Sequence, residues 1–165
     1  MGSVPIPAAP EGANPGAVVL VLFRQLHQEL RDEVAGLTDD ALNWVPTPGA
    51  NSIATIVTHL VGSETETLRS VAGVACERDR DAEFAQRRRT SADLLLLLDE
   101  ADGLLVEVWP RMERRRLTAE IPLPTLPSDE LRPGLTWLVA NYGHAREHVG
   151  QVQLTNQLYR RVAAP

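Results

Sequence analysis

Apolar residues recur at helical spacing in four separate stretches of this sequence, and this periodicity restricts the possible folds more than any other feature. The stretches are residues 17–36, 53–73, 91–112 and 135–161. In each of them, apolar residues three and four positions apart form a single stripe, which is typical of a helix with one face in a protein core. We therefore predict an all-α protein folded as a four-helix bundle, connected either in simple up-and-down order or with one crossover.

Residues that begin and end helices lie at the edges of these stretches. Asn51 or Ser52 is placed to cap the second helix, and Ser91 the third. Pro110 is expected to bend or end the third helix, because proline removes a backbone donor. Residues 38–50 are expected to be a loop with at most one short turn.

Two further segments differ in composition from the predicted helices. Residues 77–90 are mostly charged and indicate a solvated linker or an extension of the following helix. Residues 114–133 precede the last helix and should form a proline-rich extended connection without helix, with at most a short strand around residues 117–123. The prolines of this connection are Pro122, Pro124, Pro127 and Pro133.

The length of the chain is sufficient for one domain. Its 165 residues, 44% of them apolar, suffice for a single core. Residues 1–16 contain four prolines and three glycines, so we predict a flexible N-terminal arm there. Residues 17–165 are predicted to form the single bundle domain.

Charge and composition exclude several classes of function. The net charge of −6 argues against a nucleic-acid partner. All 16 basic residues are arginine, which excludes chemistry that requires a lysine amine. The longest apolar runs have 7 and 5 residues, whereas a membrane span requires roughly 20, so no membrane partner is expected. The single cysteine, Cys76, excludes a disulfide framework, and we expect a cytoplasmic protein.

A histidine pair in the last predicted helix carries the strongest chemical signal. His144 and His148 are four residues apart and therefore lie on the same helix face, which also contains Trp137 and Asn141 and points toward the core. A lone inward histidine is usually a structural residue that is hydrogen-bonded within the core. Here Asn141 and Gln151 accompany the pair, and burying so many polar groups without a use is costly. We therefore favour a metal or catalytic site.

A third ligand must come from elsewhere in the chain, and the remaining histidines are His27 and His59. His59 in the second helix is the better candidate, although it lies on the flank of its stripe, roughly 120° from the centre. His27 also lies at the edge of its stripe and is expected to be partly exposed. Glu64 falls near the middle of an apolar face and must be paired if it is buried. It is a candidate for supporting a ligand or for being a fourth one. Cys76 is interpreted as a small apolar residue rather than a nucleophile.

Three sequence segments together resemble the DinB-like superfamily of metal-binding four-helix bundles. These segments are Asn51-Ser-Ile-Ala54, Thr58-His-Leu60 and Asn141-Tyr-Gly-His-Ala-Arg-Glu-His-Val-Gly-Gln151. The resemblance implies that His59, His144 and His148 hold a divalent metal. We expect zinc, with nickel or iron as alternatives. Glu64, Asn141 and Gln151 are the candidates for residues that support these ligands from behind.

The resemblance also implies an activity. Some members of the superfamily are bacillithiol or mycothiol transferases, and mycothiol-dependent maleylpyruvate isomerase is related to them. We therefore expect a metal-dependent transferase that joins a low-molecular-weight thiol to a small electrophile and forms a homodimer. Three histidine ligands leave a position on the ion where a thiol or water loses its proton more easily. A metal-dependent hydrolase and a non-catalytic, stress-related metal-binding protein are the alternatives.

Overall fold

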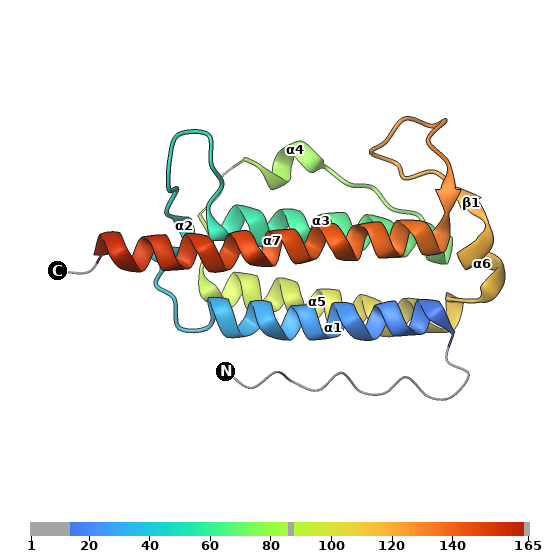
Figure 1. Ribbon diagram of the computed structural model, residues 1–165, viewed down its shortest axis with the longest axis horizontal. Helices are drawn as coiled ribbons and strands as arrows, with labels where there is room; N and C mark the ends of the chain where they lie inside the picture. Colours follow the sequence, from blue (N-terminus) through green and yellow to red (C-terminus); the bar gives the residue numbers. More distant parts are fainter. Residues whose placement is uncertain (1–13, 86–87, 164–165) are drawn as a thin grey trace.

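Four long helices form the body of the molecule in the computed structural model, which describes residues 14–85 and 88–163. The long helices are α1 (Pro15–Val34), α3 (Ile53–Ala72), α5 (Ser91–Val108) and α7 (Gly134–Ala163). They are arranged as the corners of a square, in which α1 and α3 each contact both α5 and α7 (Figure 1). The all-α fold predicted from the periodicity is confirmed.

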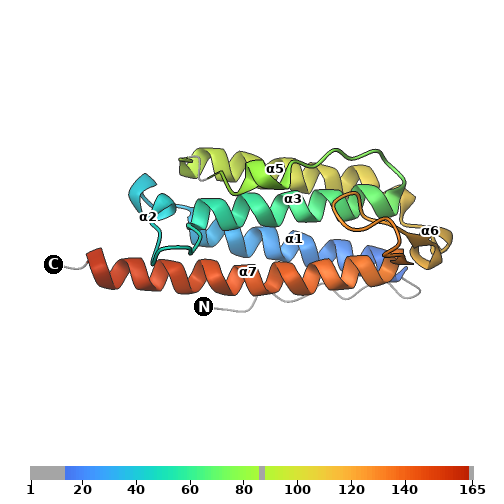
Figure 2. The ribbon, with the colours of Figure 1, turned by 90° about the horizontal axis from the view of Figure 1, so that it is seen from above.

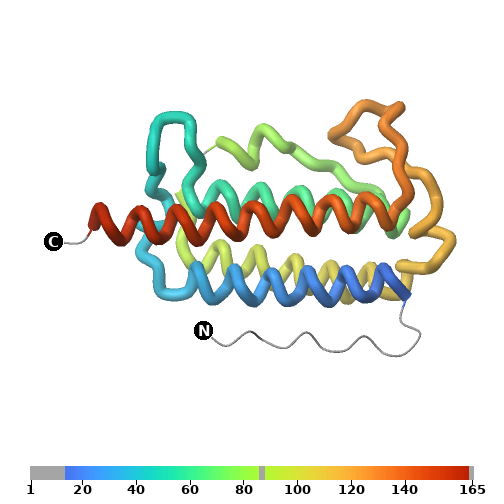
Figure 3. The backbone as a smooth tube through the Cα atoms, in the orientation of Figure 1, coloured from blue at the N-terminus to red at the C-terminus, as the bar shows by residue number. Residues whose placement is uncertain are grey.

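The connection between α3 and α5 runs back along the length of the bundle. Helices α1 and α7 run in one direction, whereas α3 and α5 run together in the other (Figure 2). Because α3 and α5 are parallel, the chain after Gly73 must return along the bundle before α5 begins, as the backbone trace shows (Figure 3). The structure thus selects the arrangement with one crossover from the two that the sequence left open.

The helix starts depend on side-chain caps. The Ser52 side chain accepts a hydrogen bond from the Thr55 backbone amide at the start of α3. Helix α5 is capped by Thr90, which forms a reciprocal capping box with Asp93. The prediction of Ser91 as this cap is wrong by one residue, because the Ser91 hydroxyl instead donates to the Val34 carbonyl at the end of α1.

The first helix begins earlier than its apolar stripe. Asn14 caps α1, and its side chain also donates to the Met112 carbonyl beyond α5. Pro15 is the first helical residue, a position where its missing N–H costs nothing. The predicted boundary between arm and domain at residue 16 therefore lies inside the helix. Residues 1–13 of that predicted arm lie outside the described residues.

Short elements occupy the connections. They are α2 (Asp39–Asn43), α4 (Arg80–Glu83), the 3-10 turn η1 (Trp109–Arg111), α6 (Arg114–Thr118), β1 (Glu120–Ile121) and β2 (Arg132–Pro133). The prediction that residues 114–133 contain no helix is wrong, because α6 forms at the start of this segment. The first proline of the segment, Pro122, comes only after α6 has ended. Strand β1 is the predicted short strand, and it pairs antiparallel with β2. Helix α5 ends just before Pro110, as expected.

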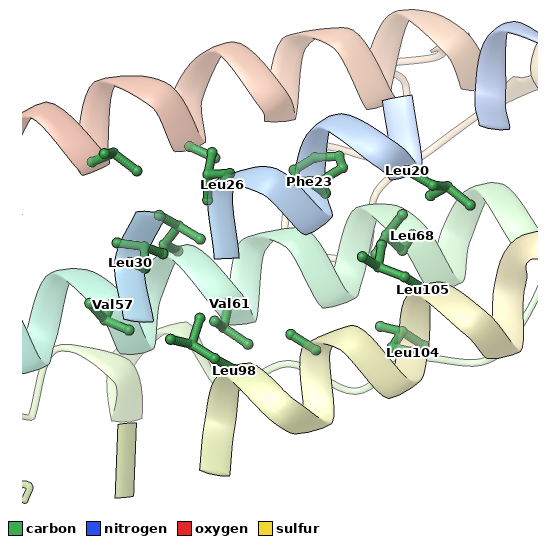
Figure 4. Close-up of a cluster of buried hydrophobic side chains, with 14 of the residues drawn as sticks. Leu20, Phe23, Leu26, Leu30, Val57, Val61, Leu68, Leu98, Leu104 and Leu105 are labelled. Atoms are coloured by element: carbon green, nitrogen blue, oxygen red, sulfur yellow. The ribbon is translucent and has the colours of Figure 1, made fainter. Parts of the chain in front are cut away.

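The core fills the space between the long helices. Leucine, valine and phenylalanine side chains from α1, α3 and α5 interlock along the bundle axis (Figure 4). Those labelled there are Leu20, Phe23, Leu26, Leu30, Val57, Val61, Leu68, Leu98, Leu104 and Leu105. No helix in the described part of the chain combines the length and apolar character needed to cross a membrane.

Candidate metal centre

Three histidines converge between α3 and α7. His59 lies on α3, while His144 and His148 lie one turn apart on α7, which packs against α3. The Nε2 atom of His144 is 3.3 Å from Nε2 of His59 and 3.1 Å from Nε2 of His148. One ligand atom from each residue lies within 4.8 Å of the others. The group can therefore hold a metal ion.

The spacing of the nitrogens fits a shared ion. Zinc binds imidazole nitrogen at about 2.0–2.1 Å in tetrahedral geometry, which places two ligand nitrogens roughly 3.3 Å apart. The two separations, 3.1 and 3.3 Å, are close to this value. Three imidazoles in this arrangement suit zinc, nickel or iron alike, so the geometry leaves the identity of the ion open.

Hydrogen bonds at the outer ring nitrogens orient two of the imidazoles. Nδ1 of His59 donates to the Glu83 carboxylate at 2.9 Å, and Nδ1 of His148 donates to the Gln151 side-chain oxygen at 2.9 Å. A proton on Nδ1 leaves the Nε2 lone pair free. Because both Nε2 atoms face His144, two lone pairs point into the centre of the group.

The surroundings of both α7 histidines favour the neutral form that metal binding requires. Burial lowers the pKa of His144 and of His148, and the neighbouring histidines lower both values further. The hydrogen bond to Gln151 opposes this effect at His148. A neutral imidazole retains the lone pair that a metal ion needs, whereas a protonated one repels the ion.

Comparison with known proteins assigns the chain to a family. A match to the DinB superfamily covers residues 22–152. The chain belongs to the DinB superfamily. Among solved structures, a DinB-like protein from Bacillus cereus is similar with a TM-score of 0.66 and 16% identity, over 85% of this chain and 89% of the other. A DinB-like protein from Bacillus subtilis has a TM-score of 0.62 and 17% identity, over 87% and 91% of the two chains. No curated protein matches the sequence.

The three residues proposed to support the ligands lie in different places in this DinB-superfamily protein. Gln151 contacts His148 directly. The Asn141 amide donates to the Ser63 hydroxyl at 2.9 Å, and its buried oxygen has no hydrogen-bond partner among the described residues. Glu64 is not part of the converging group, because its Oε2 atom pairs with His27.

His27 is the clearest difference from the sequence analysis. It was expected to be partly exposed, but it is completely buried between two carboxylates. Nε2 lies 2.8 Å from Glu64 and Nδ1 lies 2.8 Å from Asp102, which also pairs with Arg31. Burial alone would lower the pKa of His27, but these two carboxylates raise it to about 9. Burial raises the pKa of Glu64, an effect that the His27 hydrogen bond opposes.

Residues that were not predicted from the sequence cover His59. Residues 77–90 were expected to be a solvated linker, yet α4 in this segment packs against α3. Besides Glu83, the ring of Phe84 lies with its centroid 4.6 Å from that of His59. Arg78 is almost fully buried beside both. Arg78 and Glu83 pair with each other, and composition alone does not distinguish such a buried pair from solvated charges.

Proposed function

We propose that this protein is a metal-dependent transferase that joins a low-molecular-weight thiol to a small electrophile, with the ion held by His59, His144 and His148. The observation that carries the proposal is the convergence of three Nε2 atoms at the separations of a shared ion. Membership in the DinB superfamily supports it.

The proposed site keeps one position on the ion open for substrate. Within the described ranges, the converging group has three members, and Glu64 is engaged by His27. Three protein ligands are typical of catalytic zinc sites, which keep one position for an exogenous molecule. A bound ion would supply the charge that lowers the pKa of a coordinated thiol or water. His144 and His148 are only half-buried, so the group is accessible from their side.

In the proposed reaction the nucleophile comes from a bound thiol rather than from a cysteine or lysine of the chain. Cys76 lies outside the histidine group, and burial together with the Glu66 carboxylate raises the pKa of its thiol. The chain contains no lysine. A small thiol supplies the missing sulfur: its proton is released, a sulfur–carbon bond forms, and the leaving group departs with the electron pair of the bond that breaks.

Metal analysis followed by a thiol panel tests the proposal. The purified protein is loaded with zinc, nickel or iron and assayed with bacillithiol, mycothiol and other small thiols against monochlorobimane as electrophile. We expect turnover that requires both metal and thiol and that is lost in His144→Ala. A loaded protein without turnover for any thiol would contradict the proposal. Hydrolysis of ester or amide substrates without added thiol would favour the hydrolase instead.

A further inference from the structure

We propose that Glu83 is a positioning residue for His59 and that Gly62 provides the space in which its carboxylate sits. This inference rests on the proposed metal site. Glu83 is the last residue of α4, and its Oε2 atom lies 2.9 Å from Nδ1 of His59. A partner on the outer nitrogen of a ligand histidine fixes both the orientation of the ring and the nitrogen that carries the proton.

Gly62 allows the carboxylate to approach the α3 backbone. It follows His59 by three residues, so the two positions lie on the same side of the helix. A Cβ atom at Gly62 would be 2.7 Å from the Cδ atom of Glu83 and closer still to Oε1. A residue with a Cβ atom at this position would therefore displace the Glu83 carboxylate. A glycine in a helix interior is otherwise unfavourable, and here it is needed for the Glu83–His59 contact.

Arg78 holds the Glu83 carboxylate in this place. Its Nε donates to Oε1 and its Nη2 donates to Oε2, both at 2.7 Å, which is the two-pronged geometry of a strong arginine–carboxylate pair. The Arg78 and Glu83 side chains are only 7% and 9% exposed. Solvent therefore screens this pair much less than it screens a surface ion pair.

The other side of Arg78 is anchored as well. Its Nη1 donates to Glu66 of α3 at 2.9 Å. Glu66 in turn accepts hydrogen bonds from the backbone amide and the hydroxyl of Thr125 at 2.7 and 2.8 Å. The four-residue helix α4 is thus tied to α3 and to the proline-rich connection by a continuous network of charged and polar groups, which holds Glu83 beside His59 unless its carboxylate is displaced.

The arrangement selects one tautomer of His59. Arg78 Nη2 also lies 3.3 Å from Nδ1, but a carboxylate can only accept, so the closer Glu83 contact requires the proton on Nδ1. Nε2 then presents its lone pair to the ion position. Without the carboxylate, both tautomers become available and the ring is free to turn. Loss of such a partner lowers metal affinity about 10- to 100-fold.

Gly62→Ala tests this idea without touching a charged group. The added methyl group meets the end of a flexible side chain, so Glu83 can swing away while α3 keeps its fold. Gly103→Ala in α5 is the matched control, because a Cβ atom there meets nothing within 4 Å. Glu83→Ala removes the acceptor, whereas Glu83→Gln retains a side-chain oxygen that can accept from Nδ1. Far-UV circular dichroism and thermal melting verify that each variant is folded.

Two measurements are made on the full chain. Imidazole ¹⁵N chemical shifts in the metal-free protein report the tautomer of His59, and competition with a chelator gives the zinc affinity. In the parent we expect the Nδ1–H form, which Gly62→Ala and Glu83→Ala lose together with about 10- to 100-fold of zinc affinity. Glu83→Gln and Gly103→Ala should keep the tautomer.

The outcomes separate this inference from the proposed function. An unchanged His59 tautomer in Gly62→Ala and Glu83→Ala overturns the positioning role, whether or not zinc binds. A parent protein that shows the Nδ1–H form but binds no metal supports the positioning of His59 and overturns the proposed metal site.

Discussion

His27 on α1 and Glu64 on α3 form a completely buried pair, with Nε2 and Oε2 2.8 Å apart. The second nitrogen of His27 bonds to Asp102 of α5 at 2.8 Å, so a single imidazole links three of the four long helices. Directional bonds of this kind fix how the helices are registered against one another, because a shifted helix would leave a buried polar group unpaired.

The stability of the protein should depend on pH through the ionisation of His27. The folded-state pKa of His27, about 9, lies above the ordinary value of 6.5. Its contribution is therefore fully present below pH 6.5 and is lost as the pH rises through about 9, with a size on the order of 3 kcal/mol. Urea unfolding of the parent and of His27→Gln should differ most below pH 6.5. An equal difference above pH 9 would show that His27 is not charged in the folded state.

Glu64→Gln should separate the buried pair from the metal site. The amide lacks the charge that helps to raise the pKa of His27, so this pKa should fall below about 9. We expect a loss of about 1–2 kcal/mol in unfolding free energy. Zinc stoichiometry should not change, because Glu64 is outside the histidine group. Nuclear magnetic resonance titration and metal analysis measure these effects, and reduced zinc content would return Glu64 to the list of ligands.

His144→Ala, in contrast to Glu64→Gln, should abolish metal binding. His144 lies between the other two rings, with an Nε2 neighbour at 3.3 Å on one side and 3.1 Å on the other. Its removal takes away one of three ligand atoms from a half-buried helix position, so metal binding should be lost while helix content is kept. Metal content after dialysis and circular dichroism test this, with His27→Gln as the control that retains metal. Undiminished metal content in His144→Ala would remove His144 from the ligand set.

Gln151→Leu should weaken metal binding moderately. The Gln151 oxygen accepts from Nδ1 of His148, but the side chain is exposed, so water can replace it in part. We expect a decrease in zinc affinity of about tenfold, at the lower end of the range for such contacts. Gln157→Leu, at another exposed position of α7, is the control and should leave the affinity unchanged. Equal affinities for the two variants would mean that Gln151 does not orient His148.

Gly134→Ala should destabilise the start of α7. A Cβ atom there would lie 2.6 Å from the Arg116 carbonyl oxygen and 3.1 Å from a Val71 methyl group. Because a backbone carbonyl cannot swing away, we expect a loss of about 1–3 kcal/mol in unfolding free energy. Gly103→Ala, which meets nothing, should be up to about 1 kcal/mol more stable than the parent. Equal stability of the two variants in denaturant unfolding would contradict this close approach.

The four long helices could be predicted because their apolar stripes directly report which face is buried. Their ends depend on local chemistry that is less regular. Ser91 and Thr90 are both good caps, and in the structure Thr90 caps α5 in a capping box with Asp93, while the Ser91 hydroxyl donates to the Val34 carbonyl. Helix α6 was missed because the four prolines that follow it dominated the interpretation of the whole segment.

The residues of the candidate site, too, could be predicted from the sequence only in part. His144 and His148 are related by spacing within one helix, which a sequence displays, whereas His59 was selected with the help of a family resemblance. Glu83 and His27 depend on contacts between distant segments. His27 seemed exposed when α1 was considered alone, since neither Glu64 nor Asp102 is on that helix.

All three converging imidazoles come from α3 and α7, and α1 and α5 contribute none. Substitutions in α1 and α5 can change packing or surface chemistry without removing any of the three imidazole donors. Inserting or deleting a single residue between His144 and His148 has a different consequence, because it would rotate one ring away from the other by about 100°. The four-residue interval therefore keeps the two α7 donors on one face, and the third donor depends separately on His59 of α3.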